Sequence, residues 1–125
     1  MYRIEKIGEN QFYIKALGMF PPSVAKRFIK EFKKKTKKSK EFSVIVDGVD
    51  FILLNLESFS IILDFLKENN ERLHRSAWII SRNPPLDTEI QILLDRAESP
   101  KRKIVQNLED AKEWTGVKEI IIESD

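Results

Sequence analysis

The residues best placed to do chemistry lie at the start of a predicted helix, where Asn55, Glu57 and Ser58 follow a long apolar run. Asn55 is expected to cap this helix, because its side-chain oxygen can accept a hydrogen bond from a free first-turn N–H group. A phosphate on Ser58 would gain from the helix dipole and would add about two negative charges. Serine and glutamate also occur in first turns for stability alone. The segment therefore predicts either a regulatory site or a simple helix start.

Catalytic chemistry finds little support elsewhere in the sequence. Asp47 and Asp50 are paired carboxylates that could do acid–base work, although acids at strand ends are usually structural. His74 is the single histidine, which excludes a multi-histidine metal site, and no serine has an evident histidine–carboxylate relay. The four glycines are scattered and form no phosphate loop. We therefore expect no enzyme, with no catalytic residue, metal or cofactor.

Basic residues are concentrated between positions 26 and 40, where nine of them and one acid give a charge of +8 in a chain of net charge +2. The basic patch proper consists of Lys33, Lys34, Lys35, Lys37, Lys38 and Lys40. Such a run could contact nucleic acid, an anionic membrane surface or an acidic protein. Lysines also suit the negative end of a helix dipole, and no aromatic side chain lies among these six to stack on a base. We expect a solvated helix end, with anionic-surface binding as the alternative.

Composition limits the fold and the compartment. The chain has 125 residues, of which 42% are hydrophobic and 34% charged, which is typical of one soluble globular domain spanning residues 1–125. It has no cysteine, so disulfides and thiolate metal sites are excluded. The first residues carry charges where a signal peptide needs an apolar core, and every apolar run is far shorter than the roughly 20 residues that span a bilayer. We expect a cytoplasmic protein without a transmembrane segment.

Apolar periodicity predicts the elements that position these residues. Strands are expected at 2–6, 12–17, 42–46, 77–81 and 103–106, and helices at about 22–35, 56–69, 87–97 and 108–114. Asn107 is expected to cap the last helix and Gly116 to end it, while residues 117–123 fit an edge strand or a docked tail equally well. Strands alternate with helices after residue 40. The fold class is therefore α/β, with a mixed, mainly parallel sheet and about four flanking helices.

The helix after Asn55 has a wide apolar arc. The inward side chains are expected to be Leu56, Phe59, Ile62, Leu63 and Leu66. Ile61 and Phe65 fall at the border of the polar stripe. If the domain covers them only in part, they are candidate contacts for a partner, with core packing as the alternative.

Several segments occur together in a characteristic order. They are Val44-Ile-Val-Asp47, Arg75-Ser-Ala-Trp-Ile79, the stretch 89–97 followed by Ser99-Pro100 and Lys103-Ile-Val105, and Glu109-Asp-Ala-Lys-Glu-Trp114. Over about residues 11–116 the chain resembles the STAS-like family, which includes the SpoIIAA-like anti-sigma factor antagonists and a branch of small bacterial proteins of undefined role. The resemblance implies the STAS (SpoIIAA-like) architecture and a binding role without catalysis.

The resemblance also bears on the helix start. In the antagonists this helix begins with an Asp-Ser-Ser-Gly motif whose second serine is phosphorylated by a partner kinase. Aligned without gaps, residues 55–58 occupy the motif, so Glu57 takes the phosphoacceptor position and Ser58 replaces the glycine. A fixed charge at Glu57 cannot be switched. Partner switching would therefore require Ser58 to act as the acceptor.

The main functional hypothesis is a non-enzymatic STAS-like regulatory module that docks a protein partner through the start and outer edge of helix 56–69. Its contact residues would be Asn55, Glu57, Ser58, Ile61 and Phe65. The resemblance implies an alternative, because some relatives bind small molecules near strand ends. A small-ligand or lipid site of that kind would be lined by Asp47, Ser81, Arg82 and Asn83. The identity of the partner and the oligomeric state stay open.

Overall fold

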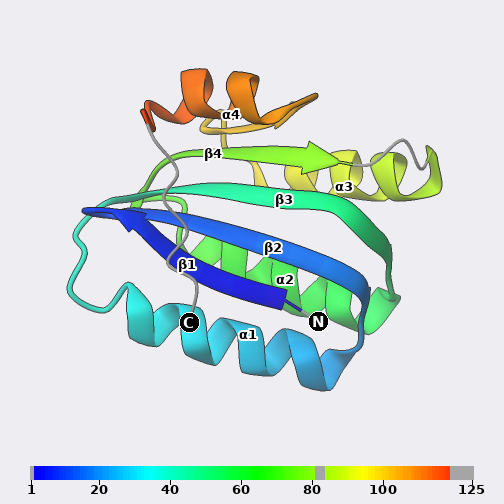
Figure 1. Cartoon of the computed structure of the whole chain (residues 1–125). Helices are drawn as coiled ribbons and strands as arrows, with labels where there is room; N and C mark the ends of the chain where they lie inside the picture. The colour runs from blue at the N-terminus through cyan, green and yellow to red at the C-terminus, as the bar shows by residue number, and fades with distance from the viewer. Residues whose placement is uncertain (1, 81–83, 119–125) are drawn as a thin grey trace.

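The computed structural model describes residues 2–80 and 84–118, with the backbone alone for residues 52–54. Within these residues, five strands form one sheet and four helices flank it (Figure 1). The strands are β1 (Tyr2–Gly8), β2 (Gln11–Phe20), β3 (Phe42–Leu54), β4 (Leu73–Ile80) and β5 (Arg102–Val105). The helices are α1 (Pro22–Lys35), α2 (Leu56–Glu68), α3 (Pro84–Ala97) and α4 (Leu108–Thr115).

The sheet has the strand order β1-β2-β3-β4-β5. β1 and β2 form an antiparallel hairpin, and β2, β3, β4 and β5 are parallel to one another. Each parallel connection passes through a helix, because parallel neighbours need a crossover to bring the chain back to the same edge. The predicted α/β class, with a mixed and mainly parallel sheet, is confirmed.

The larger core lies between the sheet and the layer formed by α1, α2 and α3 (Figure 1). Its centre is a group of phenylalanine rings, in which Phe32 lies 5.7 Å from Phe12, 5.4 Å from Phe42 and 5.6 Å from Phe65 between ring centroids. These three contacts are edge-to-face, the arrangement that the ring quadrupole favours. α1 and α2 are therefore joined to each other and to the sheet through aromatic contacts.

The opposite face of the sheet carries α4, which packs against β3, β4 and β5 (Figure 1). A smaller core lies beneath it, with Ile45 and Ala77 fully buried. Trp114 of α4 donates its indole N–H to the Ser76 carbonyl at 3.0 Å, and Arg75 lies 4.4 Å from the centre of the Trp114 ring. As predicted, Asn107 caps α4 and Gly116 ends it, with a left-handed φ of 80°.

β3 is the element that differs most from the sequence prediction. A strand ending near Val46 and a short connection were expected, whereas β3 runs for 13 residues to Leu54. Its partner β2 continues through Gly18, which has a left-handed φ of 63°, instead of ending there. The register between the two strands shifts twice, so β3 contains more residues than the strand it pairs with. Bulges of this kind keep a strand paired across polar or glycine positions that look like a break in the sequence.

Two other elements begin earlier than predicted. β4 begins at Leu73, because it pairs along β3 from Phe42 onward, and α3 begins at Pro84, because proline fits the first turn of a helix. The predicted strand residues at 81 and the edge strand or tail over 119–123 lie outside the described residues. Val117 is buried in the core beneath α4.

Candidate functional site

The start of α2 is open to solvent, and its cap is as predicted. The Asn55 side-chain oxygen accepts a hydrogen bond from the Ser58 N–H at 2.9 Å. Asn55, Leu56 and Glu57 are all exposed, and Leu56 is exposed by 88%. The prediction that Leu56 points into the core is therefore wrong. Leu56 is the first residue of the helix, directly after the Asn55 cap, and its exposed side chain lies outside the inward arc of α2.

Ser58 is fully buried, which contradicts its prediction as a surface phosphorylation site. Its Oγ donates a hydrogen bond to the Phe20 carbonyl at 2.6 Å, joining the first turn of α2 to the last residue of β2. A phosphate on this oxygen would break the bond and place two charges in a space without solvent. Ser58 therefore has a structural role in this conformation. The inward arc of α2 begins at Ser58 and Phe59, not at Leu56.

Phe65 is also buried, with 6% of its surface exposed, so of the two alternatives for this border residue core packing is correct and the partner contact is wrong. α1 covers it, because Phe28 and Phe32 both make edge-to-face contacts with its ring. Ile61 is half-buried and lines a shallow groove between α1 and α2 with Ile29. Ile61 is therefore the one apolar border residue that a partner can reach.

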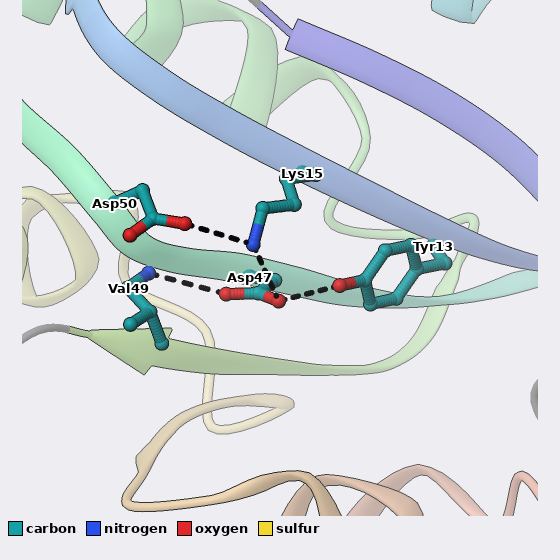
Figure 2. Close-up of polar contacts among 5 residues, drawn as sticks. All are labelled: Tyr13, Lys15, Asp47, Val49 and Asp50. Atoms are coloured by element: carbon teal, nitrogen blue, oxygen red, sulfur yellow. Dashed lines mark hydrogen bonds and ion pairs between the residues drawn. The ribbon is translucent and has the colours of Figure 1, made fainter.

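A polar cluster lies on β2 and β3, on the face of the sheet that carries α4 (Figure 2). Tyr13 donates its hydroxyl hydrogen to Asp47 Oδ2, and the Lys15 ammonium lies 3.5 Å from the same oxygen. Lys15 also lies 3.1 Å from Asp50 Oδ2. The other oxygen of Asp47 accepts from the Val49 N–H at 3.1 Å. Both oxygens of Asp47 are thus bound by groups of the same chain.

This cluster explains the first register shift of β3. Lys15 pairs with Asp47, but Leu17 pairs with Asp50, so β3 has one extra residue between them. The Asp47 side chain bonds to the N–H two residues on, which stabilises the backbone at the bulge. The hydrogen bond from Lys15 to Asp50 is the main reason that the pKa of Lys15 is raised, while burial acts in the opposite direction. The cluster therefore holds the strands in register.

The predicted ligand site at the strand ends does not form around Asp47. Asp47 lies in the middle of β3 and its oxygens are already bound, so it is not a free ligand at the edge of the sheet. Ser81, Arg82 and Asn83 lie outside the described residues. Elsewhere in the described chain, no group of three or more His, Asp or Glu side chains is arranged to hold a metal ion.

The basic patch lies at the end of α1 and in the loop that follows, and all six of its lysines are exposed. Arg72 anchors this loop by donating to the Thr36 carbonyl at 2.6 Å and the Ser39 carbonyl at 2.8 Å. Lys33 lies 3.5 Å from Glu68 of α2. Binding of an anionic surface through this patch stays a prediction.

His74 is exposed, as expected for a surface histidine. No helix within the described residues is long and apolar enough to span a membrane.

Sequence reasoning missed a cavity of about 100 Å³ between the sheet and the three-helix layer. It also missed Arg102, which lines that cavity and is only 9% exposed. A signal was available, because strand alternation places Arg102 on the same face of β5 as Ile104. Lysine and arginine residues in a strand are ordinarily expected to face solvent, so the burial of Arg102 is easily overlooked in the sequence.

The chain has a SpoIIAA-like fold, as the architecture and the strand order indicate. Its structure is similar to the crystal structure of an uncharacterised protein of the DUF3478 family from Shewanella loihica PV-4, which has a SpoIIAA-like fold. The two share 16% sequence identity over 92% of each chain, with a TM-score of 0.68. The predicted SpoIIAA-like architecture is confirmed. No family model and no curated protein matches the sequence.

Substitution of Ser58 tests its structural role against an internal control. Ser58→Ala should lower the free energy of unfolding by about 1–3 kcal/mol, because the buried Phe20 carbonyl loses its side-chain donor. Ser60→Ala, on the exposed side of the same helix, should change it by no more than about 0.5 kcal/mol. Urea unfolding of both variants makes the comparison. Equal stability of the two would show that the Ser58 bond contributes nothing.

Tyr13 should resist ionisation in the folded protein. Burial and then the Asp47 carboxylate raise its pKa above the usual value of 10. The neutral phenol is therefore favoured by folding, so its stabilising effect is complete below about pH 10 and is lost as pH rises toward the folded pKa. The difference in tyrosinate absorbance between wild type and Tyr13→Phe reports this group alone. Ionisation of Tyr13 at its usual pKa in folded protein would contradict the buried hydrogen bond.

Proposed function

We propose that the chain is a non-catalytic regulatory module that docks a protein partner through the exposed start of α2. The observation that carries the proposal is the 88% exposure of Leu56 in the first turn of an otherwise well-packed helix. A buried leucine contributes about 1.5–3 kcal/mol relative to an exposed one. Burial of Leu56 by a partner would supply that contribution at one central contact.

A second exposed apolar side chain lies at the same end of the sheet. Met19 is 58% exposed and pairs in register with Leu53, three residues before Leu56. Strand alternation places the Met19 side chain on the opposite face of the sheet from Phe20 and α2, so Leu56 is the apolar side chain that carries the proposed contact. The half-buried Ile61 lines the groove against α1, about 140° around the helix from Leu56, so it lies outside this surface.

The charge beside Leu56 defines the chemistry of the partner. Glu57 is exposed next to it, and Asn55, the residue before Leu56, is uncharged. We expect a partner with an apolar pocket for Leu56 and a basic side chain at its rim for Glu57. The SpoIIAA-like fold supports this position, since the resemblance to the antagonists implies a partner contact at the same helix start.

The burial of Ser58 argues for binding that needs no phosphate. The exposed acid at Glu57 already supplies a negative charge at the position where the antagonists carry their phosphoacceptor serine. Docking in this chain would then be controlled by the concentration of the partner or of the module itself. In this respect it differs from the phosphate-controlled partner switching of the family it resembles.

Leu56→Asp tests the docking surface, with Ile92→Asp as its matched control. Both residues are exposed apolar side chains on helices, but Ile92 lies on α3. A photo-crosslinking residue at position 60 should yield one discrete partner adduct, and the same residue at Gln91 of α3 should yield none. Leu56→Asp should reduce the adduct at least tenfold, because truncation of a central apolar contact removes more than about 1.4 kcal/mol.

The control must hold for the result to count. Ile92→Asp should leave the adduct unchanged, and both variants should unfold within about 0.5 kcal/mol of wild type, since neither side chain is buried. Equal adduct yields from the two variants would refute docking at the start of α2.

A further inference from the structure

The cavity of about 100 Å³ lies beneath α1, α2 and α3, on the opposite face of the sheet from the Asp47 cluster. Its lining is almost entirely apolar and includes the Phe65 and Trp78 rings. Apolar cavities of about 150 Å³ hold benzene in other proteins, so this space suits a short alkyl chain. Close packing is the norm in protein interiors, and a void of this size forfeits dispersion contacts on every side.

One charged side chain, Arg102, takes part in this lining. It is 91% buried at the start of β5. Its guanidinium donates to the Asn70 side-chain oxygen through one terminal nitrogen and to the Leu66 carbonyl, at 2.8 Å, through the other. The remaining nitrogen, Nε, is buried and has no hydrogen-bond partner in the described part of the chain. A buried N–H without an acceptor costs about 1–3 kcal/mol, and more for a charged group.

The charge of Arg102 is also without a carboxylate partner. None of the ion pairs among residues 2–80 and 84–118 includes it. Burial lowers the pKa of Arg102 to about 10, which leaves the group charged at neutral pH. Buried charges in proteins are ordinarily paired, so the chemistry of this site favours an anion.

We propose that the cavity binds a small apolar monocarboxylate, with its carboxylate accepting from Arg102 Nε and its hydrocarbon part filling the apolar space. A carboxylate suits the site better than a phosphate, since Arg102 is the one cation among the described lining residues and the rest of the lining is almost entirely apolar. A doubly charged group would need more donors than Arg102, Asn69 and Ser76 supply. This site is separate from the docking surface at Leu56 and does not depend on it.

The test is a titration of ¹⁵N-labelled full-length chain with butyrate, hexanoate and decanoate, followed by NMR. Hexanoate should shift the side-chain N–H signals of Arg102 and Trp78, while that of Trp114, on the opposite face, stays in place. Affinity should rise about fourfold per methylene from butyrate to hexanoate and then level off once the cavity is full. A continued rise to decanoate would assign the site to long acyl chains and overturn the proposal for a small ligand.

The neutral analogue hexanol tests the role of the charge. Hexanol should bind at least tenfold more weakly than hexanoate, because a hydrogen bond between charged groups is the stronger contact. Arg102→Gln should remove most of that difference. If this variant fails to fold, the ratio between the two probes in wild type still decides the point, and equal affinities would overturn the assignment to Arg102.

Cavity filling tests the position of the ligand while Arg102 stays intact. Val44→Ile adds one methylene to a side chain that lines the cavity and should weaken hexanoate binding several-fold. Val105→Ile makes the same change in the core beneath α4 and should leave binding unaltered. The two valines are 5% and 6% exposed, so they form a matched pair. Equal binding by both variants, or absence of any shift in wild type at millimolar hexanoate, would refute the cavity site.

Discussion

The parallel pairing of β2 with the long strand β3 determines where α2 begins and what its first turn presents. The two strands end together, with Phe20 opposite Leu54, and Asn55 then starts the helix. The Ser58 hydroxyl bonds to the last carbonyl of β2, so the rotation of α2 about its axis is fixed at its first turn. Once Ser58 faces inward, Leu56 must face outward, since residues two apart lie on different sides of a helix.

The same pairing explains why a polar cluster lies on β2 and β3. β3 has more residues than β2, and the first excess is accommodated at the bulge that Asp47 stabilises. Asp47 is buried enough to need partners, and Tyr13, Lys15 and the Val49 N–H supply them (Figure 2). A bound carboxylate of this kind maintains register and has no oxygen left for a ligand. The two sites thus differ. The oxygens of Asp47 are bound by groups of the same chain, whereas Arg102 Nε beside the cavity has no acceptor in the described chain.

Repeating sequence patterns predicted the strands and helices correctly. They did not predict the orientation of side chains that one long-range contact determines. The alternation of strands and helices predicted the α/β sheet, and the two asparagine caps were predicted because capping is a local interaction. The orientation of the first turn of α2 depends on the Phe20 carbonyl, 38 residues away from Ser58, and no local pattern encodes it. The apolar arc was therefore assigned with Leu56 inside. The helical pattern left Phe65 between core packing and a partner contact for a similar reason, because the rings that cover it belong to α1.

Arg102 shows how a buried charge can be held without an acid. Its guanidinium bonds to the Leu66 carbonyl and to Asn70, which lie at the end of α2, where the helix dipole is negative. Lys101 adds a second cation by donating to the Asn70 carbonyl at 3.0 Å. The oxygens at this helix end offset part of the cost of burying Arg102, and both terminal nitrogens have acceptors. Nε is the one nitrogen of this guanidinium left without an acceptor in the described chain, so it is there that an anion would add most to the stability of the fold.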